Sequence, residues 1–463
     1  MERDYDIADL EAWDARIRKK VEEFGLDTYR QEFELCDHNQ MLAFMAYSGM
    51  PSHYPHWSYG KSFEKLKTLY DYGVSGLPYE MVINSDPALA YLMRGNSLAL
   101  HILTIAHVYG HNDFFKNNFT FKSTRAEYTI GSFKSHAQRV RAYAEDPSIG
   151  LERVEAVLDA AHALSLQCRR NLAVQKRSET DARRVALETA APKVDPFQSV
   201  HRAQPYVEPD LRRTPIEPDP DLLLFIRDHN PYLAEWEKDV LTIAHEESQY
   251  FIPQIETKIM NEGWASYWHY RILKSLELDP DLSFAFIVSH SQVLRPHEGG
   301  INPYHLGFNI WEDIHRRAGA DGDAEIFAVR EVDRDTSFLR RHLTEDLIRK
   351  LDLFQYQRKG NDYVITQVAD EQGWREVRDT LIASVGMNSV PIIRVVDGDS
   401  GGKRTLALEH VHDGRDLHPE YAERTLAFVH QLWQHEVTLD TTLSGKRSLL
   451  VHNERGFTVK SPK

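Results

Sequence analysis

The residue pattern changes character near residue 360, and this change constrains the fold more than any other feature of the chain. Before it, apolar residues recur at helical spacing, as in the first such segment, whose apolar positions are Ile7, Leu10, Trp13, Ile17, Val21 and Phe24. After it, short apolar and β-branched runs predict strands, namely DYVITQV, SVPIIRVVD, RTLALEHV, HEVTLDTT and SLLVHNE, with helices near 371–384 and 418–434. The sequence therefore predicts a mainly helical domain over residues 1–355 and a small α+β domain over residues 356–463.

Local signals place two elements in the first third of the helical domain. The segment YEMVIN predicts a short strand. A helix is expected to follow over residues 86–112, with Asp86 as its N-cap and Pro87 at its first position.

Further signals organise the rest of the chain. One long helix is expected over residues 147–190, with Asp146 as its N-cap. The proline-rich stretch 191–221 is expected to be an extended crossing segment or an exposed linker. The SGG sequence at 400–402 predicts a hairpin turn in the C-terminal domain.

Length, charge and cysteine content exclude several classes of protein. The chain has 463 residues, enough for two or three domains with substantial cores. Its net charge is −15, so we expect neither nucleic acid nor a membrane surface as a partner. Cys36 and Cys168 are isolated, which fits a reducing compartment. The charged N-terminus and the shortness of the apolar runs predict a cytoplasmic protein without membrane insertion.

The stretch AHVYGHNDFFKNN places His107 and His111 four residues apart. Residues at this spacing share one face of a helix, so both imidazoles can reach one metal ion. The polar residues that follow either orient these imidazoles through hydrogen bonds or form a polar helix C-terminus, and they are Asp113, Lys116, Asn117 and Asn118.

A second fragment of metal-site chemistry lies in DVLTIAHEESQYF. His245 and Glu246 form the first half of the zincin HExxH motif, in which two histidines bind zinc and the glutamate polarises water. Gln249 stands where the second histidine should be, so the motif is broken. Glu262, sixteen residues after Glu246, matches the third ligand of glutamate-type zincins.

Packing of the two helical fragments against each other would unite these residues in one mixed site. We expect His107, His111, His245 and Glu262 to be the ligands of a divalent metal, and Glu246 to be the general base. Zinc is favoured, with iron or manganese as alternatives. The competing interpretation is that these side chains are hydrogen-bonded polar groups of an ordinary core.

The stretch SHSQVLRPHEGGINPYHLGFNIWEDI contains many potential hydrogen-bonding groups on an irregular backbone. We expect His297, Glu298, Asn302, Tyr304 and His305 to line the substrate side of the site. A buried polar network that only rigidifies the fold is the alternative.

Several long motifs in series resemble the stage V sporulation protein R (SpoVR) family. They are GMPSHYPHWSYGKSFE, YEMVINSDPALAYLM, AHVYGHNDFFKNN, MNEGWASYWHY and VLRPHEGGINPYHLGFNIWEDI, and the resemblance spans nearly the whole chain. It implies a bacterial cytoplasmic protein connected with formation of the peptidoglycan cortex of the spore. Relatives also occur in bacteria that form no spores, and the resemblance supplies no catalytic residues.

Two classes of function follow from these observations. The first is a zincin-like, metal-dependent hydrolase with a helical core, acting on a peptide, an amide or a peptidoglycan precursor. The second is a non-catalytic regulatory or scaffold protein whose C-terminal domain binds a protein partner, as the broken HExxH motif suggests. A ferritin-like redox protein ranks last because Glu-x-x-His pairs are too few. No nucleotide-binding loop and no GxSxG elbow occurs.

Overall fold

A computed structural model describes residues 5–72, 80–170, 176–190, 208–297, 300–353, 355–359, 362–367 and 373–461. The chain divides into two compact units, each built from two segments. Unit 1 comprises Met1–Arg141 and Gln249–Ser389, and unit 2 comprises Ala142–Ser248 and Val390–Lys463. The second unit groups the C-terminal sheet with residues 142–248, and the division into domains over residues 1–355 and 356–463 stays a prediction.

Unit 1 begins with helix α1 (Ile7–Glu23), which confirms the first predicted helix. The side chain of Asp6 accepts a hydrogen bond from the backbone of Asp9, and Asp9 reciprocates, so the helix starts with a capping box. Leu10, Ile17 and Val21 are buried on one face, as the apolar spacing predicts.

A three-stranded sheet follows, in the order β1-β3-β2. Strand β1 (Gln31–Cys36) runs parallel to β3 (Ala88–Met93), and β2 (Glu80–Ile83) runs antiparallel to β3. The predicted strand YEMVIN is confirmed by β2. The helix predicted from Asp86 is wrong over its first part, because ALAYLM is the central strand and a six-residue apolar run does not distinguish strand from helix.

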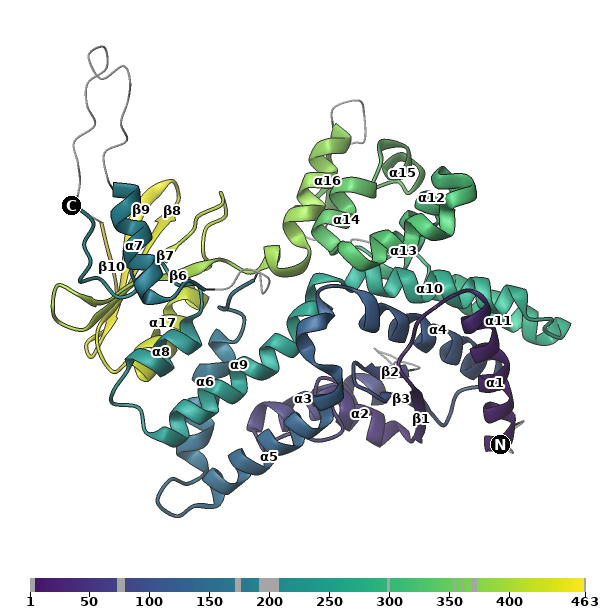
Figure 1. The fold of residues 1–463 in the computed structure, drawn as a ribbon, viewed down its shortest axis with the longest axis horizontal. Coiled ribbons are helices and arrows are strands. Elements are labelled where there is room, and N and C mark those ends of the chain that lie inside the picture. Colours follow the sequence, from purple (N-terminus) through teal and green to yellow (C-terminus); the bar gives the residue numbers. More distant parts are fainter. Residues whose placement is uncertain are drawn as a thin grey trace, which may run out of the picture. The chain divides into compact units, whose positions relative to one another are not determined.

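Helix α4 (Leu98–Asn117) starts only at Ser97, whose side chain accepts a hydrogen bond from the backbone of Leu100. It packs against α10 (Lys258–Ser275), and α10 packs against α12 (Pro303–Ala318). Figure 1 shows α4 and α10 lying side by side in this unit. The aromatic core between these helices is fully buried and includes Trp264, Trp268 and Trp311.

Smaller elements complete unit 1. They are α2 (His38–Ala46), α3 (Trp57–Asp71), α11 (Pro280–Val293), α13 (Gly322–Val332), α14 (Asp335–His342), α15 (Glu345–Lys350), α16 (Gly373–Ser384) and the hairpin β4 (Gln355–Lys359) with β5 (Asp362–Gln367). Helices α5 (Thr129–Glu145) and α9 (Glu235–Glu256) each contribute residues to both units.

The first turn of α10 is held by Asp335 of α14. Its two carboxylate oxygens accept hydrogen bonds from the backbone nitrogens of Ile259 and Met260, each at 2.9 Å. Burial raises the pKa of Asp335 to about 7, although these two hydrogen bonds act in the opposite direction.

The raised pKa of Asp335 predicts a specific pH dependence of stability. The folded protein holds this proton more tightly than the unfolded chain, so the contribution of Asp335 to the free energy of unfolding falls as pH rises from about 4 to about 7. Asp335→Asn cannot ionise, and we expect it to gain stability relative to wild type between pH 5 and pH 8. Urea unfolding at the two pH values measures the difference, and a difference independent of pH would contradict the prediction.

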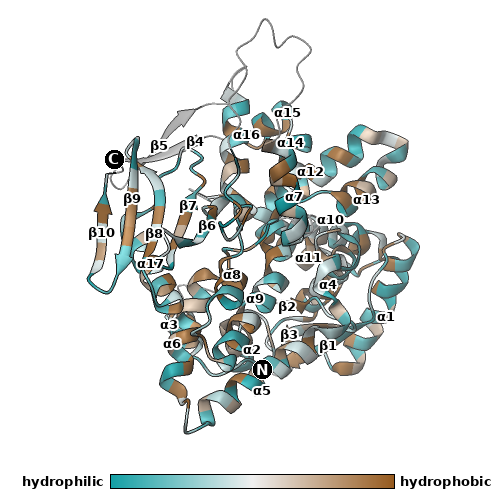
Figure 2. Cartoon of the chain, turned by 60° about the vertical axis from the view of Figure 1, so that its left-hand side comes forward, coloured by the Kyte–Doolittle hydropathy of each residue, from teal (hydrophilic) through white to brown (hydrophobic). Residues whose placement is uncertain are grey.

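Unit 2 contains a five-stranded sheet in the order β10-β9-β8-β7-β6. Figure 2 shows the five strands side by side, each carrying both hydrophobic and hydrophilic residues. The strands are β6 (Ile393–Ser400), β7 (Thr405–His410), β8 (Val437–Leu443), β9 (Lys446–Asn453) and β10 (Gly456–Lys460). Helix α17 (Pro419–Trp433) packs on strands β8 to β10. The α+β character of the C-terminal region and its predicted hairpin between β6 and β7 are confirmed.

The helices of unit 2 correct one expectation. The single helix predicted over 147–190 is wrong, because α6 (Leu151–Leu164) and α7 (Glu179–Ala190) are separate. Asp146 accepts hydrogen bonds from Ser148 within the turn before α6, so it is not an N-cap. Helix α8 (Leu222–His229) follows, and of the predicted extended segment residues 191–207 lie outside the described part.

None of the helices in the described ranges combines the length and the apolar character that a bilayer crossing requires.

Candidate metal centre

Glycines allow the helices of unit 1 to pack so closely that their backbones are in contact. A Cβ atom added to Gly110 of α4 would lie 2.6 Å from the Cα atom of Ala265 in α10. A Cβ atom on Gly307 of α12 would lie 2.1 Å from the carbonyl oxygen of Ile259. Real Cβ atoms do not come this close, so only glycine permits these crossings. The side chains next to Gly110 can therefore reach those of α10.

Two histidines and two glutamates meet beside this crossing. His107 and His111 come from α4, Glu262 comes from α10, and Glu80 comes from β2. The donor atoms of Glu80, His107 and His111 all lie within 4.8 Å of one another. The distance from Glu262 Oε2 is 3.4 Å to His111 Nε2 and 3.9 Å to His107 Nε2, and Glu80 Oε1 lies 3.6 Å from His107 Nε2.

Both histidines turn Nε2 toward the carboxylates and use Nδ1 elsewhere. His111 Nδ1 donates a hydrogen bond to Asn261 Oδ1 at 2.9 Å, because an amide oxygen can only accept. His107 Nδ1 lies 2.9 Å from Nδ1 of His269. This use of the second ring nitrogen is typical of metal-binding histidines.

Burial and neighbouring groups shift the pKa values of Glu80 and Glu262 in opposite directions. Burial raises the pKa of Glu80 well above its usual range, and the nearby charge of Glu262 raises it further. Burial also acts to raise the pKa of Glu262, but hydrogen bonds with His107 and His111 outweigh it and hold this pKa far below its usual range. Burial lowers the pKa of His107 to about 4. The pKa values of the two carboxyl groups in the cluster are therefore shifted in opposite directions, that of Glu80 upward and that of Glu262 downward.

Two predicted site residues belong to the other compact unit. His245 Nε2 lies 2.9 Å from Asp221 Oδ2, so this imidazole already has a carboxylate partner. The Glu246 side chain is exposed. Among the described residues, the group whose donor atoms gather within 4.8 Å contains neither of them. Their predicted roles as ligand and general base remain predictions.

The predicted substrate-side residues have different environments. Asn302 caps α12 by accepting hydrogen bonds from the backbone of Tyr304 and His305. Its amide donates to the carbonyl oxygen of Val293, the last residue of α11, and to that of Arg295. The ring of Tyr304 lies 6.0 Å from that of His107, at the cluster. His305 is half-buried, His297 is exposed, and Glu298 lies outside the described residues.

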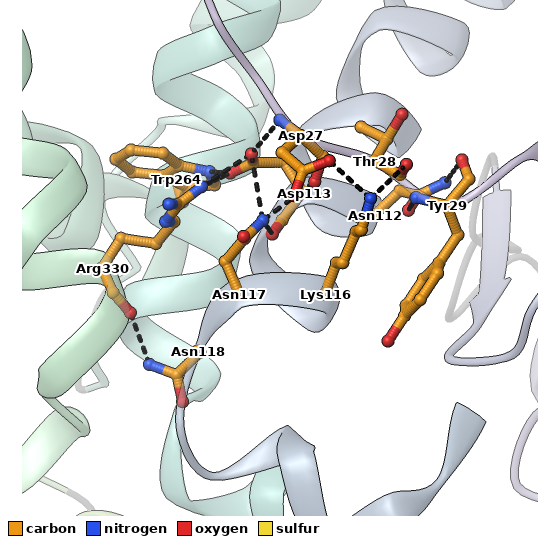
Figure 3. Close-up of polar contacts among 10 residues, drawn as sticks. All are labelled: Asp27, Thr28, Tyr29, Asn112, Asp113, Lys116, Asn117, Asn118, Trp264 and Arg330. Atoms are coloured by element: carbon orange, nitrogen blue, oxygen red, sulfur yellow. Dashed lines mark hydrogen bonds and ion pairs between the residues drawn. The ribbon is translucent and has the colours of Figure 1, made fainter.

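The polar residues after His111 hold the C-terminal half of α4 in place, as Figure 3 shows. Asp113 Oδ1 and Oδ2 each accept a hydrogen bond from Arg330 Nη1 at 2.7 Å, and Oδ2 also accepts one from Trp264 Nε1. Asn112 and Lys116 bind the segment that follows α1. These contacts favour the interpretation that this stretch anchors the helix C-terminus over the interpretation that it orients the imidazoles of His107 and His111.

Sequence reasoning missed Glu80, Asn261 and His269 as parts of the site. A signal for His269 exists, because it lies seven residues after Glu262 and therefore on the same face of α10. Glu80 had no such signal, since its strand is far from α4 in sequence and only the tertiary fold brings them together.

The fold and cluster describe a helical protein with a buried mixed histidine and carboxylate centre, and comparisons with known proteins identify its family. The family described as "SpoVR like protein" matches residues 4–390, and the "SpoVR-like C-terminal domain" matches residues 391–444. The chain belongs to the SpoVR-like family, which confirms the resemblance. The border between the two matches falls next to the unit boundary at Ser389.

One curated relative, from Escherichia coli (strain K12), is described as uncharacterized protein YcgB. It is 32% identical over 467 residues, which cover 93% of this chain and 91% of the relative. No solved structure was found to match the chain.

Proposed function

We propose that this protein binds one divalent transition metal at His107, His111 and Glu262 and uses it to hydrolyse a peptide or amide bond. The observation that carries this proposal is the convergence of four potential donor side chains at the crossing of α4 with α10. Zinc is the favoured metal, because two imidazoles and one carboxylate form a common catalytic zinc site.

The distances between the donor atoms support a single ion. Donors around a tetrahedral zinc lie ~3.4 Å apart when each bond is ~2.1 Å. The corresponding separations here are 3.4 Å and 3.9 Å between Glu262 and the two histidines. Only small side-chain movements would be required to close this set around an ion.

Glu80 takes the general-base role in this proposal, in place of Glu246, because it lies within the cluster. A bound divalent cation would polarise a substrate carbonyl and lower the pKa of nearby water. Burial raises the pKa of Glu80, and the positive charge of a cation bound beside it would favour the ionised form again. Glu80 Oε2 is buried and has no hydrogen-bond partner among the described residues, so in its ionised form it can accept the proton of the attacking water. Tyr304 lies on the side where we expect the substrate.

The family suggests where such a reaction would act. We propose a cytoplasmic substrate connected with formation of the spore cortex, such as a peptide or a peptidoglycan precursor.

Elemental analysis tests the metal centre directly. Protein purified without a metal-binding tag should contain one equivalent of zinc, iron or manganese, and the His107→Ala/His111→Ala variant should contain less than a tenth of it. His101→Ala is the matched control, because His101 is buried in the same helix and pairs with Tyr5 instead of the cluster. The absence of metal from wild type, or its retention in the double variant, would refute the proposal.

The assigned roles of the two glutamates can be separated in the same way. We expect Glu262→Gln to lose most of the metal and Glu80→Gln to retain it. Loss of metal from both variants to the same extent would make Glu80 a ligand and remove it as the general base.

A non-catalytic scaffold is the second candidate, and the glutamine at position 249 favours it by breaking the HExxH motif. In that case the C-terminal domain docks a protein partner. Recovery of a stable partner by full-length protein but not by a chain ending near residue 355, together with wild-type behaviour of Glu80→Gln in cells, would favour this function.

A further inference from the structure

Three buried histidines form a hydrogen-bonded chain that starts at the cluster. His107 Nδ1 lies 2.9 Å from His269 Nδ1, and His269 Nε2 lies 2.7 Å from His290 Nδ1. The three residues come from α4, α10 and α11. His107 and His269 are fully buried, whereas His290 retains 8% of its exposure and reaches the surface.

Two imidazoles can share a hydrogen bond only when one of the facing nitrogens carries a proton and the other does not, and both contacts of the chain have this geometry. All three rings are buried, which disfavours the charged form of each. A neutral imidazole has one N–H donor and one bare nitrogen acceptor. Each ring therefore fixes the tautomer of the next, and the chain as a whole has only two hydrogen-bonded states.

The two states differ at His107 Nε2, which faces Glu80 and Glu262. In one state His290 donates to His269, His269 donates to His107, and His107 carries its proton on Nε2. In the other state every hydrogen bond runs in the opposite direction, and His107 Nε2 is bare. Only the second state can bind a metal, because a ligand nitrogen cannot carry a proton.

We propose that His269 and His290 are positioning residues that set the tautomer of His107, so that occupation of the metal centre reverses the hydrogen bonds along the whole chain. This inference rests on the proposed function. Reversal moves one proton from His269 to His107 and one from His290 to His269. His107 Nε2 releases one proton, and His290 Nε2 takes one from the surroundings. Each ring keeps a single proton.

The rings around His290 hold it in the orientation that this chain requires. Tyr270 stacks on it at 4.8 Å between ring centroids, and Phe308 lies edge-on at 5.3 Å. When the tautomer of His107 changes, the tautomer of His290 can therefore change as well, without rotation of the His290 ring.

Nitrogen NMR of the histidine side chains tests the reversal in the full-length protein. Perdeuterated protein with ¹⁵N-labelled histidine is freed of metal and then titrated with zinc. We expect His290 to change from the Nδ1–H to the Nε2–H tautomer on saturation, and we expect no change in the His107→Ala variant. If zinc binds but the His290 signals do not change, the proposed reversal of the hydrogen bonds is refuted and the metal site is not. If wild-type protein binds no zinc, both the reversal and the proposed function are refuted.

Two substitutions of His269 separate positioning from packing. His269→Asn keeps an oxygen that accepts the Nδ1–H of His107, whereas His269→Leu removes every acceptor. We expect zinc affinity within about threefold of wild type for the asparagine variant and a loss of about 10–100-fold for the leucine variant. Equal losses in two variants of similar thermal stability would overturn the proposal.

Discussion

Asp113→Ala is expected to lower the free energy of unfolding by about 3–5 kcal/mol, because it leaves the guanidinium of Arg330 buried without its counter-charge. Arg330 is only 8% exposed, and Asp113 is fully buried. The substitution also removes acceptors for Trp264 Nε1 and for the backbone nitrogen of Asp27. Urea unfolding measures the loss, which is a large fraction of the total stability of an ordinary domain.

Lys116→Ala is the matched control for this prediction. Lys116 lies one turn further along the same helix and pairs with Asp27, but the two side chains are 31% and 61% exposed. An exposed pair of this kind contributes at most about 1 kcal/mol. Equal losses in the two variants would contradict the assignment of Asp113 as a buried anchor. Adding Arg330→Met to Asp113→Ala should restore part of the stability, since it removes the uncompensated charge.

The parts of the fold that the sequence predicts correctly are those with a local cause. The spacing of the apolar residues in α1 and the β-branched runs of the C-terminal sheet each determine an element without help from the rest of the chain. Strand β3 was mistaken for a helix because its identity depends on pairing with two partners, one of them 57 residues earlier. The pattern does not predict that α6 ends at Leu164, because the residues on both sides of this end have helical spacing.

The candidate centre shows the same division between local and tertiary causes. The pair His107 and His111 is a local signal, since the helix alone puts both rings on one face. Glu262 was selected for its spacing from Glu246, yet its position in the cluster depends on the crossing of α10 with α4. Glu80 and the histidine chain depend on tertiary contacts alone. Residue spacing within one helix predicts ligands on that helix, but it does not predict which other elements complete the site.

Gly110 lies where α4 and α10 cross closely, so adding one methyl group at this position tests whether the crossing holds the metal centre together. Gly110→Ala would place its Cβ 2.6 Å from the backbone of Ala265, so the helices must separate. We expect the free energy of unfolding to fall by about 1–3 kcal/mol, as in other overpacked cores. Separation would also move His107 and His111 away from Glu262, and metal sites tolerate only ~0.2 Å of such displacement. We therefore expect zinc affinity to fall at least tenfold.

Gly131→Ala is the matched control for Gly110→Ala. Gly131 is an exposed residue of helix α5, and a Cβ there would meet nothing within 4 Å. The same substitution should be neutral or raise stability by about 0.5–1 kcal/mol, because alanine favours the helix, and zinc affinity should not change. If Gly110→Ala retained zinc as tightly as Gly131→Ala, the metal could not be bound between α4 and α10, whatever the stability of the variant.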